Sequence, residues 1–337
     1  MLVFIVLKTH ALRAQVSDFK SLDLVRVDNR VRSLKGAALD NLPILAHRLT
    51  QGLPTEVEKF RAIYTWVCTN IKGDRAQHNT VDRMRKKLKN DSLALVDWNA
   101  EYKKVAFAKL KRKKKTMCTG YAYLIKELCY LAGIEAVIID GYGRTVDANV
   151  TKLENANHSW NAVRLNDKWY LCDATWSSGY MEEGRGFVSD YNDGYFLTDP
   201  VLFGKNHYPL EQKWSLQTTF AQEDFAASPL VYGNTFAQRV IPLLPKKMET
   251  VALKNETVFF SLKTLTKAVD QELSMSYYSN NEEKTLTISN LQWNNGTVSF
   301  THQFKRKGIF DIHLKVNDDI IATYVFKVTD KDQPSGP

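Results

Sequence analysis

Two strand-like segments separated by only two residues place the strongest constraint on how this chain folds. The first spans residues 158–165 and the second spans residues 168–175, and an Asn-Asp pair lies between them. A two-residue connection of this kind is typical of a tight antiparallel hairpin, so Leu165 should pair with Lys168. That single pair determines the register of the whole hairpin, and therefore which side chains share a face.

The predicted register brings a histidine and a carboxylate together. Counting back from the turn places Trp160 opposite Asp173 and His158 opposite Thr175, so His158 and Asp173 are diagonal neighbours on one face. The Cα atoms of diagonal neighbours are about 7 to 8 Å apart, which an imidazole and a carboxylate can span. The spacing therefore predicts a hydrogen bond between His158 and Asp173.

A cysteine precedes this hairpin at the start of a predicted helix. Apolar residues follow Cys118 at helical spacing until Gly133 ends the pattern. A thiol with a pKa of about 8.5 is only a few per cent ionised at neutral pH, so a nucleophilic cysteine needs a group that favours the thiolate. A helix dipole contributes about 0.3 to 1 kcal/mol, which is less than one pKa unit. A cationic partner is also needed, and His158 is the candidate.

Cys118, His158 and Asp173 follow one another in the order nucleophile, base and orienting carboxylate. Alone, each has a structural interpretation, as a packing cysteine, a structural histidine, and a turn or capping aspartate. Their joint arrangement favours a catalytic triad. The backbone N–H of Cys118 is the first oxyanion donor that we expect, and the sequence identifies no second one. Trp160 and Trp176 are candidates for a substrate wall, although tryptophans at such spacings are more often core residues.

The other cysteines carry no sign of metal or disulfide chemistry. Cys68 and Cys129 lie on apolar faces of predicted helices, and Cys172 should point away from the face of Asp173, so all three are expected to be packing residues. No Cys-x-x-Cys pattern, His/Cys cluster or calcium-loop pattern is present in the sequence. We therefore expect neither a metal nor a cofactor.

Positive charge is concentrated just before Cys118. Residues 83–115 contain 13 Lys or Arg and three acidic residues, a local net charge of +10 in a chain whose total is +9. Such a block can bind nucleic acid or an acidic surface, or it can be a solvated insertion. No nucleic-acid-binding module accompanies it, so we expect no nucleic-acid partner. Two interpretations of the block stay open. It can bind an acidic partner, or its electrostatic field can favour the thiolate or attract an anionic substrate.

The chain begins with a short apolar run. Residues 1–7 are apolar, and two basic residues follow before Ala14. This is typical of a secretory signal with a shortened basic region that is cleaved after Ala14, and a buried strand is the alternative. The run is too short to span a bilayer, and no other stretch is apolar enough. We expect a secreted, periplasmic or envelope-associated protein, or a cytoplasmic one if residues 1–14 are not a signal.

The patterns along the chain predict two domains. Residues 17–50 should form a connection and one helix, and a capping box from Thr55 to Glu58 should start the next helix. Further strands are expected at residues 135–142 and 193–200. Beyond residue 215, short segments separated by turn residues are typical of a β-sandwich. The predicted strands there cover residues 258–262, 285–288, 297–302, 310–316 and 320–328. We divide the chain into a domain at 17–235 with the basic insertion 83–115, a sandwich at 245–330 and a tail at 331–337.

Five segments carry a resemblance to a known family. They are Ala62–Ile71, Cys118–Ile134, His158–Val163, Trp169–Trp176 and Tyr195–Pro200. Together they resemble the transglutaminase-like superfamily, and most closely its kyphoscoliosis-peptidase branch. The resemblance implies an α+β, papain-like core in which the nucleophile helix packs on an antiparallel sheet, followed here by an all-β, Ig-like sandwich.

The resemblance also implies a chemistry for the three candidate residues. In family members with this triad, the residues corresponding to Cys118, His158 and Asp173 attack an amide carbonyl, form a thioester and pass the acyl group to an amine or to water. We therefore expect a protein or peptide substrate. The alternative is a protein that keeps the fold without turnover and serves as an interaction or scaffold protein. The oligomeric state is open.

Overall fold

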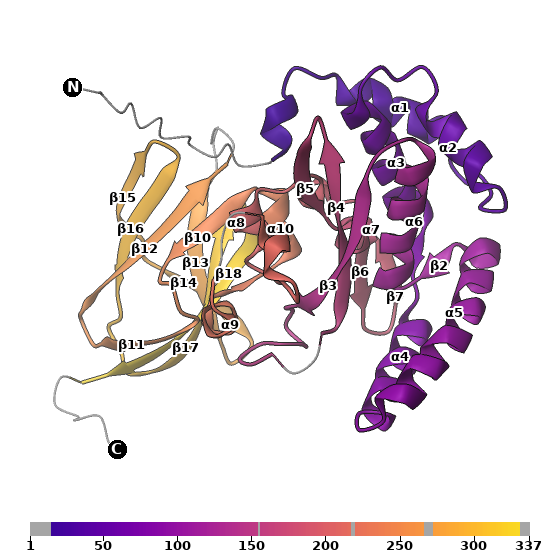
Figure 1. Ribbon diagram of the computed structural model, residues 1–337. Coiled ribbons are helices and arrows are strands. Elements are labelled where there is room, and N and C mark those ends of the chain that lie inside the picture. The colour runs from indigo at the N-terminus through magenta and orange to yellow at the C-terminus, as the bar shows by residue number, and fades with distance from the viewer. Residues whose placement is uncertain (1–14, 154–155, 217–219, 266–271, 331–337) are drawn as a thin grey trace, which may run out of the picture.

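The computed structural model describes residues 15–153, 156–216, 220–265 and 272–330. A β-sandwich lies on one side of the molecule, helices lie on the other, and a second sheet lies between them (Figure 1). The predicted signal segment 1–14 and the tail 331–337 lie outside the described residues, so both stay predictions. Within the described part of the chain, no helix is both long enough and apolar enough to cross a membrane.

The helical side of the core is built from four α-helices and one short 3-10 helix, η1. The predicted capping box starts α3: the Thr55 hydroxyl accepts a hydrogen bond from the Glu58 N–H, and the Glu58 carboxylate accepts one from the Thr55 N–H. Residues 17–50 contain two helices, not the single predicted one, because Asp23 and Asn41 each cap a helix start. The elements are η1 (Val16–Phe19), α1 (Leu24–Ser33), α2 (Leu42–Thr50), α3 (Glu56–Asn70) and α6 (Cys118–Leu131).

An antiparallel sheet supports the nucleophile helix. Its strands have the order β5-β4-β3-β8, and the predicted pairing of Leu165 with Lys168 is confirmed. Helix α6 packs on this sheet, because Tyr121 and Leu124 share one buried apolar cluster with Val163. The strands are β3 (Ala136–Gly143), β4 (His158–Leu165), β5 (Lys168–Cys172) and β8 (His207–Pro209).

Two predicted strands end differently in the structure. The second hairpin strand stops at Cys172, because Asp173 caps the short helix α7 (Ala174–Ser178) by accepting hydrogen bonds from two of its N–H groups. The prediction that Thr175 pairs with His158 is therefore wrong. Residues 193–200 are not a strand either. They form η2 (Asp193–Tyr195) and lead into α8 (Pro200–Phe203), each started by a capping side chain.

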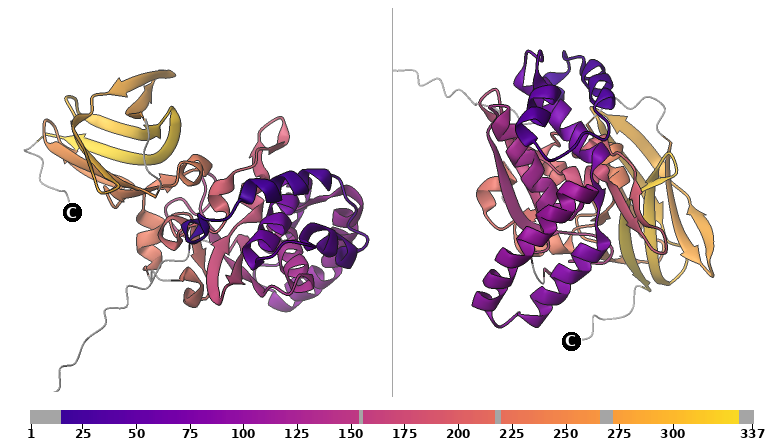
Figure 2. Two further views of the ribbon diagram at one scale, coloured as in Figure 1. Left: turned by 90° about the horizontal axis from the view of Figure 1, so that it is seen from above. Right: turned by 90° about the vertical axis from the view of Figure 1, so that its right-hand side faces the viewer.

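The basic insertion folds as a helical hairpin that projects from the body (Figures 1 and 2). It consists of α4 (Arg75–Lys87) and α5 (Ser92–Lys113). Strand β1 (Lys72–Gly73) leads into it and pairs in parallel with β2 (Lys115–Thr116), which leads out of it. The chain thus leaves the core and returns to it at neighbouring points, directly before Cys118.

The C-terminal part is a sandwich of two sheets with the strand orders β10-β12-β16-β15 and β11-β18-β17-β13-β14. In immunoglobulin lettering these orders correspond to A-B-E-D and A′-G-F-C-C′. Strand β11 (A′) pairs in parallel with its neighbour β18 (G). Phe260, Phe300 and Tyr324 lie in the core between the sheets. The strands are β10 (Val240–Leu244), β11 (Glu249–Leu253), β12 (Thr257–Thr264), β13 (Leu273–Ser279), β14 (Glu282–Leu286), β15 (Ser289–Asn294), β16 (Thr297–Gln303), β17 (Gly308–Val316) and β18 (Asp319–Thr329).

The predicted sandwich strands are only part of this set. Four of the five predicted segments lie in β12, β16, β17 and β18, and the fifth, residues 285–288, overlaps only the end of β14. Strand β10 already pairs with β12, so the sandwich includes residues 240–244, which the predicted division left between the domains. Alternation is weak in β15, whose residues are all exposed, and this strand was not predicted.

The sandwich and the core are joined by pairing and by aromatic packing. Strand β9 (Leu230–Val231) pairs with β18, and the Tyr195 and Phe236 rings stack with their centroids 4.2 Å apart. Both rings belong to one buried cluster with Ile241 of β10. The remaining elements are β6 (Gly179–Glu182), β7 (Gly186–Ser189), η3 (Gln212–Ser215), α9 (Gln222–Ala227) and α10 (Gly233–Ala237).

We predict that Gly120→Ala lowers the free energy of unfolding by about 1 to 3 kcal/mol, because a methyl group in a filled site forces its neighbours apart. A Cβ atom at Gly120 would overlap the Thr116 side chain, with Thr116 Cβ only 2.8 Å away. Urea unfolding measures the change. Adding Thr116→Ala should restore part of the loss, and a Gly120→Ala variant as stable as the parent would contradict this account.

Candidate active site

Cys118 is the first residue of α6, and its side chain is nearly covered, with 7% of the residue exposed. The preceding residue, Met117, provides no side-chain cap for the helix. Among the described residues, no group accepts a hydrogen bond from the Cys118 N–H. This N–H therefore has no partner among the described residues, and its role as an oxyanion donor stays a prediction.

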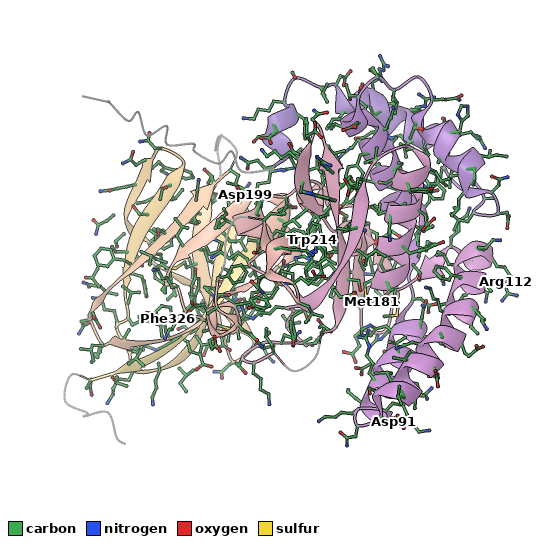
Figure 3. All side chains as sticks on the ribbon, viewed as in Figure 1. Asp91, Arg112, Met181, Asp199, Trp214 and Phe326 are labelled. Carbon is green, nitrogen blue, oxygen red and sulfur yellow. The ribbon has the colours of Figure 1, made fainter. Side chains whose placement is uncertain are left out.

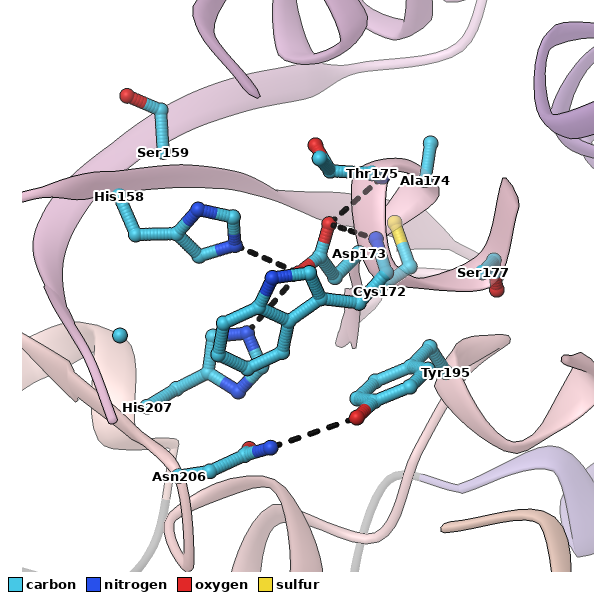
Figure 4. A network of polar contacts seen from close by, with 12 residues as sticks. His158, Ser159, Cys172, Asp173, Ala174, Thr175, Ser177, Tyr195, Asn206 and His207 are labelled. Carbon is cyan, nitrogen blue, oxygen red and sulfur yellow. Dashed lines mark hydrogen bonds and ion pairs between the residues drawn. The ribbon is translucent and has the colours of Figure 1, made fainter. Parts of the chain in front are cut away.

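His158 and Asp173 form the predicted hydrogen bond. His158 Nε2 lies 2.7 Å from Asp173 Oδ2, as Figure 4 shows. The other carboxylate oxygen accepts hydrogen bonds from the Thr175 and Trp176 N–H groups at 2.8 and 3.2 Å. Because Nε2 is engaged by Asp173, Nδ1 is the ring nitrogen available to the thiol of Cys118.

The electrostatics of the three groups favour an ion pair between the thiol and the imidazole. Burial opposes the charge on His158, but the charge and hydrogen bond of Asp173 outweigh it and raise the pKa of His158 to about 10. Burial also opposes the Asp173 carboxylate, yet the contacts with His158 hold its pKa well below the usual range. For Cys118, burial is again outweighed, because the hydrogen bond and charge of His158 lower the pKa of the thiol.

The two candidate wall tryptophans have different environments. Trp176 is partly exposed and stacks on His158, with the ring centroids 4.4 Å apart and an interplanar angle of 13°. An indole face in this position stabilises an imidazolium and remains available as a substrate wall. Trp160 is only 1% exposed and packs with Leu171 and Phe203. The prediction that Trp160 lines a substrate wall is therefore wrong, since its ring is part of the core under the sheet.

A second histidine, which the sequence analysis missed, completes the network. His207 Nε2 lies 3.1 Å from the same oxygen of Asp173 (Figure 4). The His207 ring stacks on Phe203 with the ring centroids 3.8 Å apart. Complete burial lowers the pKa of His207 to about 4 despite its contact with the carboxylate. His207 is thus neutral and donates a hydrogen bond from Nε2–H to Asp173. It lies in the three-residue strand β8. This strand pairs with β3, and no local sequence pattern predicts that pairing.

His158, Asp173 and His207 also form the one group in the described part of the chain with the spacing of metal ligands, since their ligand atoms lie within 4.8 Å of one another. Both histidines, however, direct Nε2 to the same oxygen of Asp173. A carboxylate that already accepts these two hydrogen bonds has its lone pairs directed at nitrogen atoms, and we interpret the group as a hydrogen-bonded network.

The other three cysteines are buried free thiols. Burial raises the pKa of each of them, Cys68, Cys129 and Cys172. They are packing residues, as predicted, and Cys118 is the one cysteine whose pKa is shifted downward.

We predict that Cys118 reacts with iodoacetamide at pH 6 at least tenfold faster than an ordinary cysteine, of which only about 0.3% is thiolate at that pH. The reason is the lowered pKa of Cys118 beside His158. Mass spectrometry of the alkylated chain gives the rate at each pH, and the three buried thiols provide an internal control. His158→Gln should remove the reaction at pH 6, because burial then acts alone and raises the pKa. A pH profile of Cys118 equal to that of a free peptide cysteine would contradict the ion pair.

Comparison with known proteins agrees with this fold. Residues 44–174 match the model of the transglutaminase-like superfamily. Kyphoscoliosis peptidase of Homo sapiens is 32% identical over 200 residues, which cover 58% of this chain and 27% of that protein. Hillarin of Drosophila melanogaster is 28% identical over 215 residues, which cover 57% of this chain and 24% of that protein. The chain thus spans about a quarter of the length of these curated relatives.

Among solved structures, a crystal structure of a TGase is 17% identical and covers 54% of this chain and 38% of its own, with a TM-score of 0.28. Residues 44–174 thus form a transglutaminase-like domain, and over 58% of its length the chain is similar to a kyphoscoliosis peptidase.

Proposed function

We propose that this protein is a cysteine-dependent enzyme that hydrolyses amides of proteins or peptides, or transfers their acyl groups to amines. The single observation that carries the proposal is the hydrogen bond between His158 and Asp173. His158 in turn lowers the pKa of the Cys118 thiol. A packing cysteine has no need of such a partner, because burial alone keeps it protonated, as at Cys129.

The reaction follows from the positions of the three groups. The Cys118 thiolate attacks the amide carbon, and the carbonyl oxygen gains negative charge that the free Cys118 N–H stabilises. The His158 imidazolium then donates its proton to the amide nitrogen, the C–N bond breaks, and the amine leaves a thioester behind. In the second half, His158 takes a proton from water or from an amine as it attacks the thioester, and the thiolate is released.

Asp173 acts through His158. It holds the Nε2 hydrogen of the imidazole, so that Nδ1 faces the thiol, and its negative charge stabilises the imidazolium that persists in the resting state. The peptidase and the transferase reactions share every step as far as the thioester. They differ only in whether water or an amine attacks it. The related human protein is named a peptidase, which is consistent with water as the acceptor in this branch.

A non-catalytic interaction protein is the alternative that the sequence left open. The completeness of the site argues for catalysis, because a buried carboxylate held by four donors is a specialised arrangement that binding alone does not require. The experiment that separates the two readings is product analysis.

We predict that the parent protein converts members of a peptide library in the presence of an added amine, and that Cys118→Ala lowers the rate by at least about a thousandfold. Mass spectrometry identifies the products: shortened peptides indicate a peptidase, deamidated glutamine an amidohydrolase and amine adducts a transferase. Cys129→Ala, which removes a buried thiol from the far end of α6, is the matched control and should retain activity. Products that are the same with Cys118→Ala would exclude the proposed mechanism.

We propose that His207 is a positioning residue, and we predict the effect of replacing it. His207→Phe keeps the stacking on Phe203 but removes the donor to Asp173, so kcat should fall about tenfold, the equivalent of one hydrogen bond to a charged group. KM should stay within about twofold, because the residue lies behind Asp173 and away from the thiol. His207→Gln retains an N–H donor and should restore most of kcat. Equal losses in both variants, or a loss that follows stability alone, would reduce His207 to a packing residue.

A further inference from the structure

The basic helical hairpin lies directly against the candidate nucleophile. Val81 of α4, Met117 and Cys118 form one buried cluster, and Trp98 and Tyr102 of α5 pack against it. The two aromatic rings stack with their centroids 4.7 Å apart and an interplanar angle of 15°. Both are only partly buried. The thiol thus lies beside an aromatic surface that the hairpin supplies.

Both helices of the hairpin are anchored to the segment that leads into Cys118. The Asp74 N–H donates to the Thr116 carbonyl at 2.8 Å, and the Asp74 side chain caps α4. The same carboxylate forms an ion pair with Lys109 of α5. The base of the hairpin is therefore held next to the nucleophile, while its far end, marked by Asp91 in Figure 3, lies away from the body.

One basic side chain links the hairpin to the other half of the site. Arg85 Nη1 donates to the Ala156 carbonyl at 3.4 Å, two residues before His158. Arg85 lies one helical turn beyond Val81, so the two residues share the face of α4 that is turned toward Cys118. Lys89 lies in the turn beyond the end of α4, so the helical period does not place it on this face. Arg83 has the same charge as Arg85 but lies about 160° away from Val81 around the axis, at about 100° per residue.

We propose that the hairpin α4–α5 is the substrate-binding arm of the enzyme, and that its substrate is a protein or peptide segment with Asp or Glu beside the reacting residue. Trp98 and Tyr102 contact the substrate chain next to the thiol, and Arg85 binds its carboxylate. This inference rests on the proposed function. It is argued from charge complementarity, because residues 83–115 carry a net charge of +10 and the rest of the chain is close to neutral.

The arm also accounts for the covered thiol. Cys118 is only 7% exposed, and part of its cover is the cluster with Val81. Few residues hold the hairpin down: in the described structure only Gln77 and Val81 of α4 and Leu110 of α5 are buried. Elements with so few buried side chains open at low cost, so a substrate that binds the arm can move Val81 away from the thiol while the contacts of Asp74 hold the base of the hairpin in place.

The test compares two charge reversals on one helix. Arg85→Glu changes the face turned toward Cys118, and Arg83→Glu makes the same change in net charge on the opposite side. The substrates are two peptides that differ only in Glu or Gln beside the reacting residue. At low ionic strength, Arg85→Glu should lower kcat/KM for the Glu peptide about tenfold and for the Gln peptide less than about twofold.

The control Arg83→Glu should change kcat/KM for either peptide less than about twofold. Equal losses from the two reversals would show that the field of the whole insertion acts and would overturn the assignment of Arg85. Equal losses for the two peptides would overturn the acidic substrate class. Trp98→Ala should weaken binding of both peptides, and unchanged binding would remove the aromatic pair from the arm.

Binding is measured separately from turnover, so that the two proposals can fail independently. Calorimetry with the Cys118→Ala variant should show tighter binding of the Glu peptide than of the Gln peptide, and Arg85→Glu should abolish the difference. If this preference is observed and the parent enzyme converts neither peptide, the catalytic proposal fails and the arm stands. If both peptides are converted and neither binds preferentially, the arm fails and the catalytic proposal stands.

Discussion

The buried carboxylate of Asp173 is the interaction on which the site and much of the surrounding fold depend. One oxygen caps α7 and the other accepts hydrogen bonds from His158 and His207. The backbone of the same residue is also engaged, since its N–H donates to the Tyr195 carbonyl and its carbonyl accepts from the Tyr64 hydroxyl. Asp173 thereby connects two strands of the sheet, β4 and β8, to α3, α7 and η2.

This arrangement is physically demanding, and its demands explain the composition of the surroundings. A carboxylate removed from water is stable only when donors replace its hydration, and here two backbone N–H groups and two imidazoles do so. The aromatic rings of Trp160, Trp176 and Phe203 surround the imidazoles and exclude water from them. In such surroundings the charge of Asp173 acts strongly on His158, which in turn lowers the pKa of Cys118.

The two large additions to the core, the sandwich and the helical hairpin, lie on different sides of it (Figure 2). The sandwich packs through Phe236 against Tyr195, whose ring lies edge-on to His207 and Trp176. The helical hairpin packs through Val81 against Met117 and Cys118. The carboxylate end of the triad is therefore supported by one addition and the thiol end by the other.

Local patterns were sufficient for the elements that contain the proposed triad. A two-residue turn permits one register, and the register placed His158 and Asp173 in contact; the capping box of α3 and the apolar period of α6 depend likewise on residues a few positions apart. The end of β5 was not predicted. Asp173 accepts hydrogen bonds from two N–H groups of α7, and the sequence does not distinguish an aspartate within a strand from one that caps a helix. His207, the core position of Trp160 and the packing of Val81 against Cys118 depend on contacts between segments 34 or more residues apart or on burial by other elements. No short-range rule encodes such contacts, because they exist only once the sheet, the hairpin and the sandwich have packed together.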